Sequence, residues 1–126
     1  MFAHVSIGVT DFVRSLGFYD SVMKALGYGR LFGDEKDSFM AYGPEESFFI
    51  INLPLDESRK AQACNGTHLC LKAEDKDRVD AFYDVAIKHG ATCGGAPGLR
   101  LHYSNDYYAA FILDPDGHKI EAMARV

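Results

Sequence analysis

Two histidines and one glutamate are the residues of this chain best suited to metal chemistry. His4 and His68 each lie early in a segment that alternates apolar and polar residues, and Glu121 interrupts the apolar run Ile-Glu-Ala-Met. Two imidazoles and one carboxylate commonly bind divalent zinc, nickel, manganese or iron, and they leave positions open for water or substrate. The residue types therefore favour a divalent metal site, although no HExxH or CxxC signature accompanies them.

The segment around Glu121 predicts two strands joined by a tight turn, Asp114–Gly117. Proline presets the backbone of such a turn, and glycine closes it without steric cost. If the first and last residues of this turn pair, Ala110 lies opposite Glu121. Tyr108 then lies opposite Met123, on the same face of the sheet as the glutamate.

The chain repeats itself with an offset of 64 positions. The matched landmarks are His4 and His68, Asp11 and Asp75, and Phe18-Tyr19 and Phe82-Tyr83. Each half reads as a strand, a helix with an aspartate near its start, and three further strands. We therefore expect one domain, residues 1–126, made of two modules at about 1–54 and 66–126, with a polar linker at 55–65.

The periodicity of apolar residues locates the elements of each module. In the first module we expect a strand at 2–9, a helix at about 12–26, and short strands near 29–32, 38–42 and 48–53. In the second we expect a strand at 67–73, a helix ending near 88, a strand near 91–93, a loop at 94–106 and the final hairpin.

Alternation along the strands decides which side chains can meet. His4 and His68 lie on the faces away from their helices, and Glu121 shares that face in the second module. The corresponding position in the first module is Asn52, whose carbonyl oxygen is a neutral and weaker donor. His4, Asn52, His68 and Glu121 are therefore the candidate ligands of one concave surface.

Composition and charge exclude several classes of function. The net charge of −5 argues against nucleic acid, which needs a basic stripe, and no apolar run approaches the ~20 residues that span a bilayer. The N-terminus lacks the basic and apolar regions of a signal peptide. Three cysteines without CxxC spacing fit a reduced chain, so we expect a cytoplasmic protein that contacts neither nucleic acid nor membrane.

In these features the chain resembles the vicinal-oxygen-chelate superfamily of glyoxalases, bleomycin-resistance proteins and extradiol dioxygenases. The resemblance covers nearly the whole chain and rests on His4, Ser15–Tyr19, Leu26–Tyr28, Ala41–Glu45, Gly66–Leu71 and Phe111–Glu121. It implies an α+β fold in which two βαβββ modules form a curled mixed sheet, a cup with metal inside. Cups of this superfamily often pair, so a homodimer is expected, with each cup built from one chain or from two.

The resemblance also assigns roles to the candidate ligands. Glyoxalase-I-like members place ligands at the positions of His4, Asn52, His68 and Glu121, with a carboxylate where this chain has Asn52. A set of two histidines and Glu121 is closer to what extradiol dioxygenases present to iron. Glu121 would be catalytic and would move a proton beside a carbonyl of a small, oxygen-rich substrate.

The expected loop at 94–106 is rich in residues that could bind a substrate. We hypothesise that Arg100, Tyr103 and Tyr108 line the substrate site, with Arg100 binding an anionic group. The alternative is that the tyrosines only pack over an open end of the cup.

Three functions are consistent with this interpretation. The first is a metal-dependent enzyme of the isomerase or lyase type, with a ring-cleaving dioxygenase as a variant of it. The second is a metal-independent protein that sequesters a ligand, as bleomycin-resistance proteins do. The third is a catalytically silent member with structural histidines.

Overall fold

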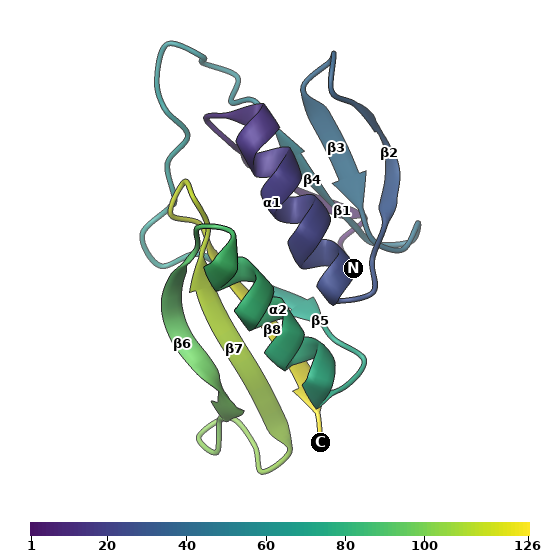
Figure 1. Cartoon of the computed structure of the whole chain (residues 1–126), viewed down its shortest axis with the longest axis vertical. Helices are drawn as coiled ribbons and strands as arrows, with labels where there is room; N and C mark the ends of the chain where they lie inside the picture. Colours follow the sequence, from purple (N-terminus) through teal and green to yellow (C-terminus); the bar gives the residue numbers. More distant parts are fainter.

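The computed structural model describes residues 1–126 as two βαβββ modules with separate sheets (Figure 1). The first module consists of β1 (His4–Gly8), α1 (Phe12–Ala25), β2 (Arg30–Asp34), β3 (Phe39–Tyr42) and β4 (Phe48–Asn52). The second consists of β5 (His68–Lys72), α2 (Lys76–Lys88), β6 (Thr92–Leu99), β7 (Tyr107–Leu113) and β8 (Lys119–Arg125). The predicted α+β class and the module repeat are confirmed.

The two sheets have the same strand order. It is β1-β4-β3-β2 in the first and β5-β8-β7-β6 in the second, with one parallel pair in each, β1 with β4 and β5 with β8. Each helix covers one face of its own sheet, and both helices lie on the same side of the molecule (Figure 1). We call the opposite, uncovered face of each sheet its open face.

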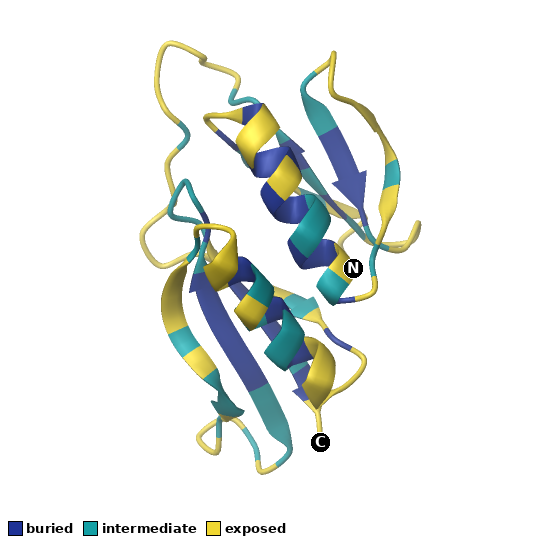
Figure 2. Ribbon diagram, viewed as in Figure 1, coloured by how far each residue is buried: buried dark blue, intermediate teal, exposed yellow.

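The helices form where the sequence caps them and gives them an apolar side. Asp11 and Asp75 are the N-caps, and their side chains accept hydrogen bonds from the backbone N–H groups of Arg14 and Arg78 at 3.1 and 2.9 Å. One apolar cluster of 21 buried residues draws on both modules. Figure 2 shows this core between the helices and the sheets, where burial of apolar surface stabilises the fold. Neither helix has the length and apolarity that a membrane crossing requires.

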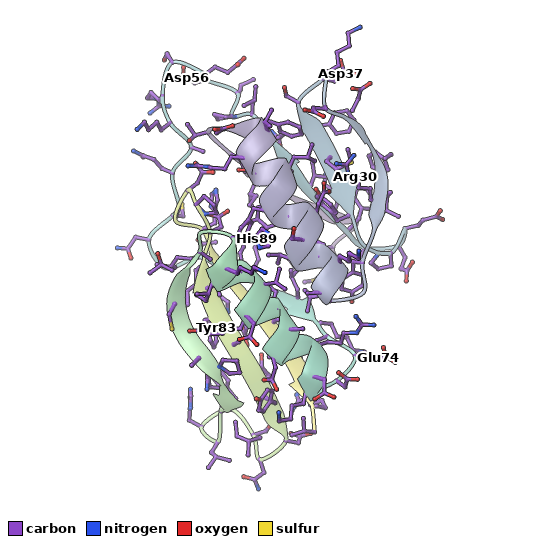
Figure 3. All side chains as sticks on the ribbon, viewed as in Figure 1. Arg30, Asp37, Asp56, Glu74, Tyr83 and His89 are labelled. Carbon is purple, nitrogen blue, oxygen red and sulfur yellow. The ribbon has the colours of Figure 1, made fainter.

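The linker between the modules contains no helix or strand. It is nevertheless fixed to the first module, because the backbone N–H of Ala61 donates to Thr10 Oγ1 at 3.0 Å. Its outer part, including Asp56, projects away from the rest of the molecule (Figure 3).

The prediction of a loop at 94–106 is wrong for its first half, because β6 continues to Leu99. Glycine and proline are typical of loops, but β6 is an edge strand, where a proline without an N–H is tolerated. The pairing of β6 with β7 also shifts register twice, between Cys93 and Gly95 and between Gly95 and Gly98. These bulges accommodate residues that interrupt a regular ladder.

The turn between β7 and β8 joins the second module to the first. Asp114 accepts a hydrogen bond from the buried Tyr19 hydroxyl at 2.6 Å, and Asp116 accepts one from the backbone of Thr10 at 3.1 Å. His118 Nε2 lies 2.7 Å from the carbonyl oxygen of Gly8, to which it donates. These contacts, together with packing of α1 against α2, hold the modules in one arrangement.

Candidate functional site

The open face of the second sheet brings His68 and Glu121 together. Parallel pairing of β5 with β8 places Cys70 beside Glu121. His68 lies two residues before Cys70 on β5 and therefore on the same face. Glu121 is 2% exposed, and its Oε2 lies 3.0 Å from His68 Nε2. Burying an unpaired carboxylate costs free energy of folding, and the contact with His68 reduces that cost.

Tyr107 is a site residue that the sequence analysis missed. Its hydroxyl donates to Glu121 Oε1 at 2.7 Å, so both carboxylate oxygens have partners. Burial, followed by this hydrogen bond to Glu121, raises the pKa of Tyr107 well above its usual range. Tyr107 therefore remains a neutral donor at any physiological pH.

The predicted register of the final hairpin was wrong by one residue. Glu121 lies opposite Phe111, not Ala110, and Tyr108 lies opposite Ala124. The turn is one residue longer than expected, since the backbone N–H of Asp114 donates to the carbonyl oxygen of His118, while Gly117 donates to the carbonyl oxygen of Asp114 within the turn. A shift of one residue moves every side chain of a strand to the other face, so Tyr107 and not Tyr108 lies on the face of Glu121.

Tyr108 consequently lies on the helix side of its sheet. Its hydroxyl donates to Asp80 of α2 at 2.6 Å, and Lys76 Nζ lies 5.0 Å from the centroid of its ring. The prediction that Tyr108 shares a face with Glu121 is therefore wrong.

Two other predicted substrate residues do lie near the open face. The ring of Tyr103 packs edge-on against that of Tyr107, with 5.1 Å between the centroids. The guanidinium of Arg100 lies 5.6 Å from the centroid of Phe111, the residue opposite Glu121. Their binding of a substrate stays a prediction.

Cys70 completes this part of the open face. Its Sγ lies 3.7 Å from the Tyr107 hydroxyl. Cys70 as a whole is exposed, but partial burial of its thiol, with the nearby carboxylate of Glu121 adding to it, raises the pKa of the thiol to about 12. The thiol is therefore protonated and a poor nucleophile.

The open face of the first sheet carries the remaining candidates. His4 stacks on Phe48 with 5.2 Å between the ring centroids, and its side chain is exposed. Asn52 hydrogen-bonds the Ser6 hydroxyl through Oδ1 and donates from Nδ2 to the carbonyl oxygen of Leu53 at 2.7 Å. The Ser6 hydroxyl thus takes one lone pair of the oxygen through which Asn52 would bind a metal.

Within one chain, the candidate ligands form two separate halves. No group of three or more histidine, cysteine, aspartate or glutamate side chains is close enough to hold a metal ion. The His68–Glu121 half nevertheless suits a metal, because two ligand atoms about 2.1 Å from one ion and at right angles to each other are about 3.0 Å apart. That is the separation of His68 Nε2 from Glu121 Oε2.

Two βαβββ modules, each with one helix over a four-stranded mixed sheet, define the class of fold to which this chain belongs. A family model described as the Glyoxalase/Bleomycin resistance protein/Dioxygenase superfamily matches residues 1–122. The chain belongs to this superfamily, as its sequence motifs had indicated.

Solved structures support the same assignment. A glyoxalase/bleomycin resistance protein from Albidiferax ferrireducens T118 is 35% identical and superposes with a TM-score of 0.86, over 100% of this chain and 99% of the other. A glyoxalase/bleomycin resistance protein/dioxygenase family enzyme from Burkholderia phytofirmans PsJN shares the fold at 21% identity and a TM-score of 0.70, with 98% of each chain covered. A glyoxalase-related enzyme from Fulvimarina pelagi does so at 17% identity and 0.71, over 98% of this chain and 86% of that one. No match was found among curated proteins.

Proposed function

We propose that this protein is a metal-dependent enzyme of the glyoxalase-like kind that acts on a small, oxygen-rich substrate. The observation that carries the proposal is the pair of His68 Nε2 and Glu121 Oε2, 3.0 Å apart on an open sheet face. His4 supplies the third ligand, and Asn52 is left to its hydrogen bonds with Ser6 and Leu53.

The residues of the site divide the chemistry between them. His4, His68 and Glu121 would hold a divalent ion, which would act as a Lewis acid toward a substrate carbonyl. Glu121 would be the proton acceptor, because it is the carboxylate that lies beside His68 on the open face. Tyr107 holds Glu121 in place through its 2.7 Å hydrogen bond. This arrangement serves isomerisation or lyase chemistry, and ring cleavage is the alternative.

The separation of the two halves within one chain supports a cup shared between two chains. His4 of one chain would then meet His68 and Glu121 of the other. β1 and β5 are edge strands, so each has one backbone edge that no strand pairs. The exposed surface of 7321 Å² also exceeds the roughly 6,700 Å² expected of a compact 14.0 kDa monomer. These features support the proposal of a homodimer whose sites need both chains.

The first experiment measures metal binding by full-length protein without a histidine tag. Titration with zinc, nickel, manganese and iron(II) should give one ion per chain, and His4→Ala, His68→Ala or Glu121→Gln should each abolish tight binding. Lys88→Gln, on the outer side of α2, is the control that should bind as wild type. Absence of binding for all four ions would reject the metal-dependent function and favour ligand sequestration.

Mixing two inactive variants tests whether the site is shared. His4→Ala and Glu121→Gln proteins, unfolded together and refolded at equal amounts, should regain about a quarter of the wild-type metal sites. Half of the dimers are mixed, and one of the two cups in each is then intact. No recovery in mixtures that contain mixed dimers would show that each site belongs to a single chain. Assays of hemithioacetal isomerisation and catechol cleavage then separate the two chemistries.

A further inference from the structure

Two cations converge on a single aromatic ring of the second open face. Arg100 Cζ lies 5.6 Å and Lys119 Nζ lies 5.0 Å from the centroid of Phe111. Neither side chain forms an ion pair with an acidic residue. Both charges are therefore available to a ligand.

The backbone of β6 leaves room for the Arg100 side chain. Its Nη2 donates to the carbonyl oxygen of Ala96 at 2.6 Å. A Cβ atom at Gly95 or Gly98 would lie only 3.3 Å from a guanidinium nitrogen, closer than most real contacts. The glycines that made this segment resemble a loop thus allow the guanidinium to lie against the strand and beside Phe111.

These cations adjoin the proposed metal ligands. The ring of Phe111 packs edge-on against that of His68, with 5.9 Å between the centroids, and Phe111 lies opposite Glu121. Glu121 pairs with His68 and Tyr107 and forms no ion pair with either cation. In a protein of net charge −5, Arg100 and Lys119 are therefore two neighbouring cations that no acidic side chain pairs with.

We propose that Arg100 and Lys119 form an anion clamp that binds a carboxylate or phosphate group of the substrate beside His68 and Glu121. The guanidinium offers paired donors to two oxygens of the anion, and the ammonium adds a point charge. The clamp names the substrate class of the enzyme proposed above, an anionic one, and rests on that function.

Direct binding to metal-free, full-length protein tests the clamp. Benzoate and phenyl phosphate are the anionic probes, benzamide is the neutral one, and affinities come from calorimetry in the presence of EDTA. Wild type should bind at least one anion about tenfold more tightly than benzamide, and raised salt should weaken that binding. Arg100→Gln and Lys119→Gln should each weaken it about fivefold or more, whereas Lys88→Gln should not. The ratio between the two anions tells which group fits.

Several results would overturn the clamp. One is binding of benzamide as tight as that of both anions, or no binding of any probe. Another is equal loss of affinity in Lys88→Gln and in the two clamp variants. Thermal unfolding shows whether each variant is folded. Because the probes are measured without metal, the clamp can fail while the metal titration succeeds, and the reverse, so the two proposals are separately testable.

Discussion

At the scale of single residues, Glu121 depends on Tyr107 as much as on His68. A carboxylate that is 2% exposed needs a donor at each oxygen, and these two side chains provide them at 2.7 and 3.0 Å. Tyr108, the next residue, has a hydrogen bond of similar length but serves a half-buried aspartate on α2. Neighbours in the sequence thus belong to opposite faces and to different functions.

Removing one hydroxyl at a time distinguishes these roles. Tyr107→Phe should lower the free energy of unfolding by about 1.5–3 kcal/mol, because it leaves a buried charged oxygen without its donor. Tyr108→Phe should cost less than about 1 kcal/mol, since Asp80 keeps access to water and to Lys76. Urea denaturation of both variants measures the difference, and a larger loss for Tyr108→Phe would contradict the observed register.

At the scale of elements, the turn between β7 and β8 decides which residues reach the site. Gly117 has φ +89° and donates its N–H to the carbonyl of Asp114 at 2.9 Å. A three-residue hairpin loop commonly ends with a residue of this left-handed conformation, which favours glycine. This glycine therefore helps to fix the length of the turn and hence the face of Glu121.

Two glycine-to-alanine substitutions should have opposite effects. Gly117→Ala should destabilise the protein by about 1 kcal/mol, because a side chain is strained at positive φ. Gly17→Ala, at an exposed position within α1 and with nothing within 4 Å of an added Cβ, should stabilise it by about 0.5–1 kcal/mol. Thermal unfolding measures both changes. Stabilisation by Gly117→Ala would show that the turn does not need this conformation.

At the scale of the whole molecule, the same turn joins the two modules through Asp114. This carboxyl is 5% exposed, and burial raises its pKa above the ordinary 3.8, although hydrogen bonds from Tyr19 and two backbone N–H groups oppose the change. The folded state therefore holds the proton of Asp114 more tightly than the unfolded state does. Its contribution to stability is fully present below pH 3.8 and is lost as the pH rises through the raised value.

Asp114→Asn should remove this dependence on pH. The free energy of unfolding of wild type, relative to that of the variant, should fall as the pH rises from about 4 and become constant once Asp114 is ionised in both states. Denaturation of the two proteins at a series of pH values between 3 and 8 gives the difference directly. A difference that rises with pH would mean that the turn lowers the pKa of Asp114 instead.

Local features of the sequence were sufficient for most of the fold. The 64-residue repeat, the caps at Asp11 and Asp75 and the apolar spacing depend on neighbours along the chain, and the helices and most strands lie where these patterns predict. The extent of β6 was not predicted. Its glycines are explained by close contacts with Phe111, which is distant in the chain, and with the Arg100 side chain, which takes up its position only on folding.

The sequence by itself determined the family, the two modules and the placement of His4, His68 and Glu121 on faces away from the helices. Only the tertiary structure decided that Tyr107 rather than Tyr108 meets Glu121, because the Asp-Pro-Asp-Gly sequence is compatible with a turn of either length and one residue reverses the face. It also separated His4 from the His68–Glu121 pair within one chain. That separation follows from how the modules pack through α1, α2 and the Asp114 turn, and no periodicity along the chain encodes such packing.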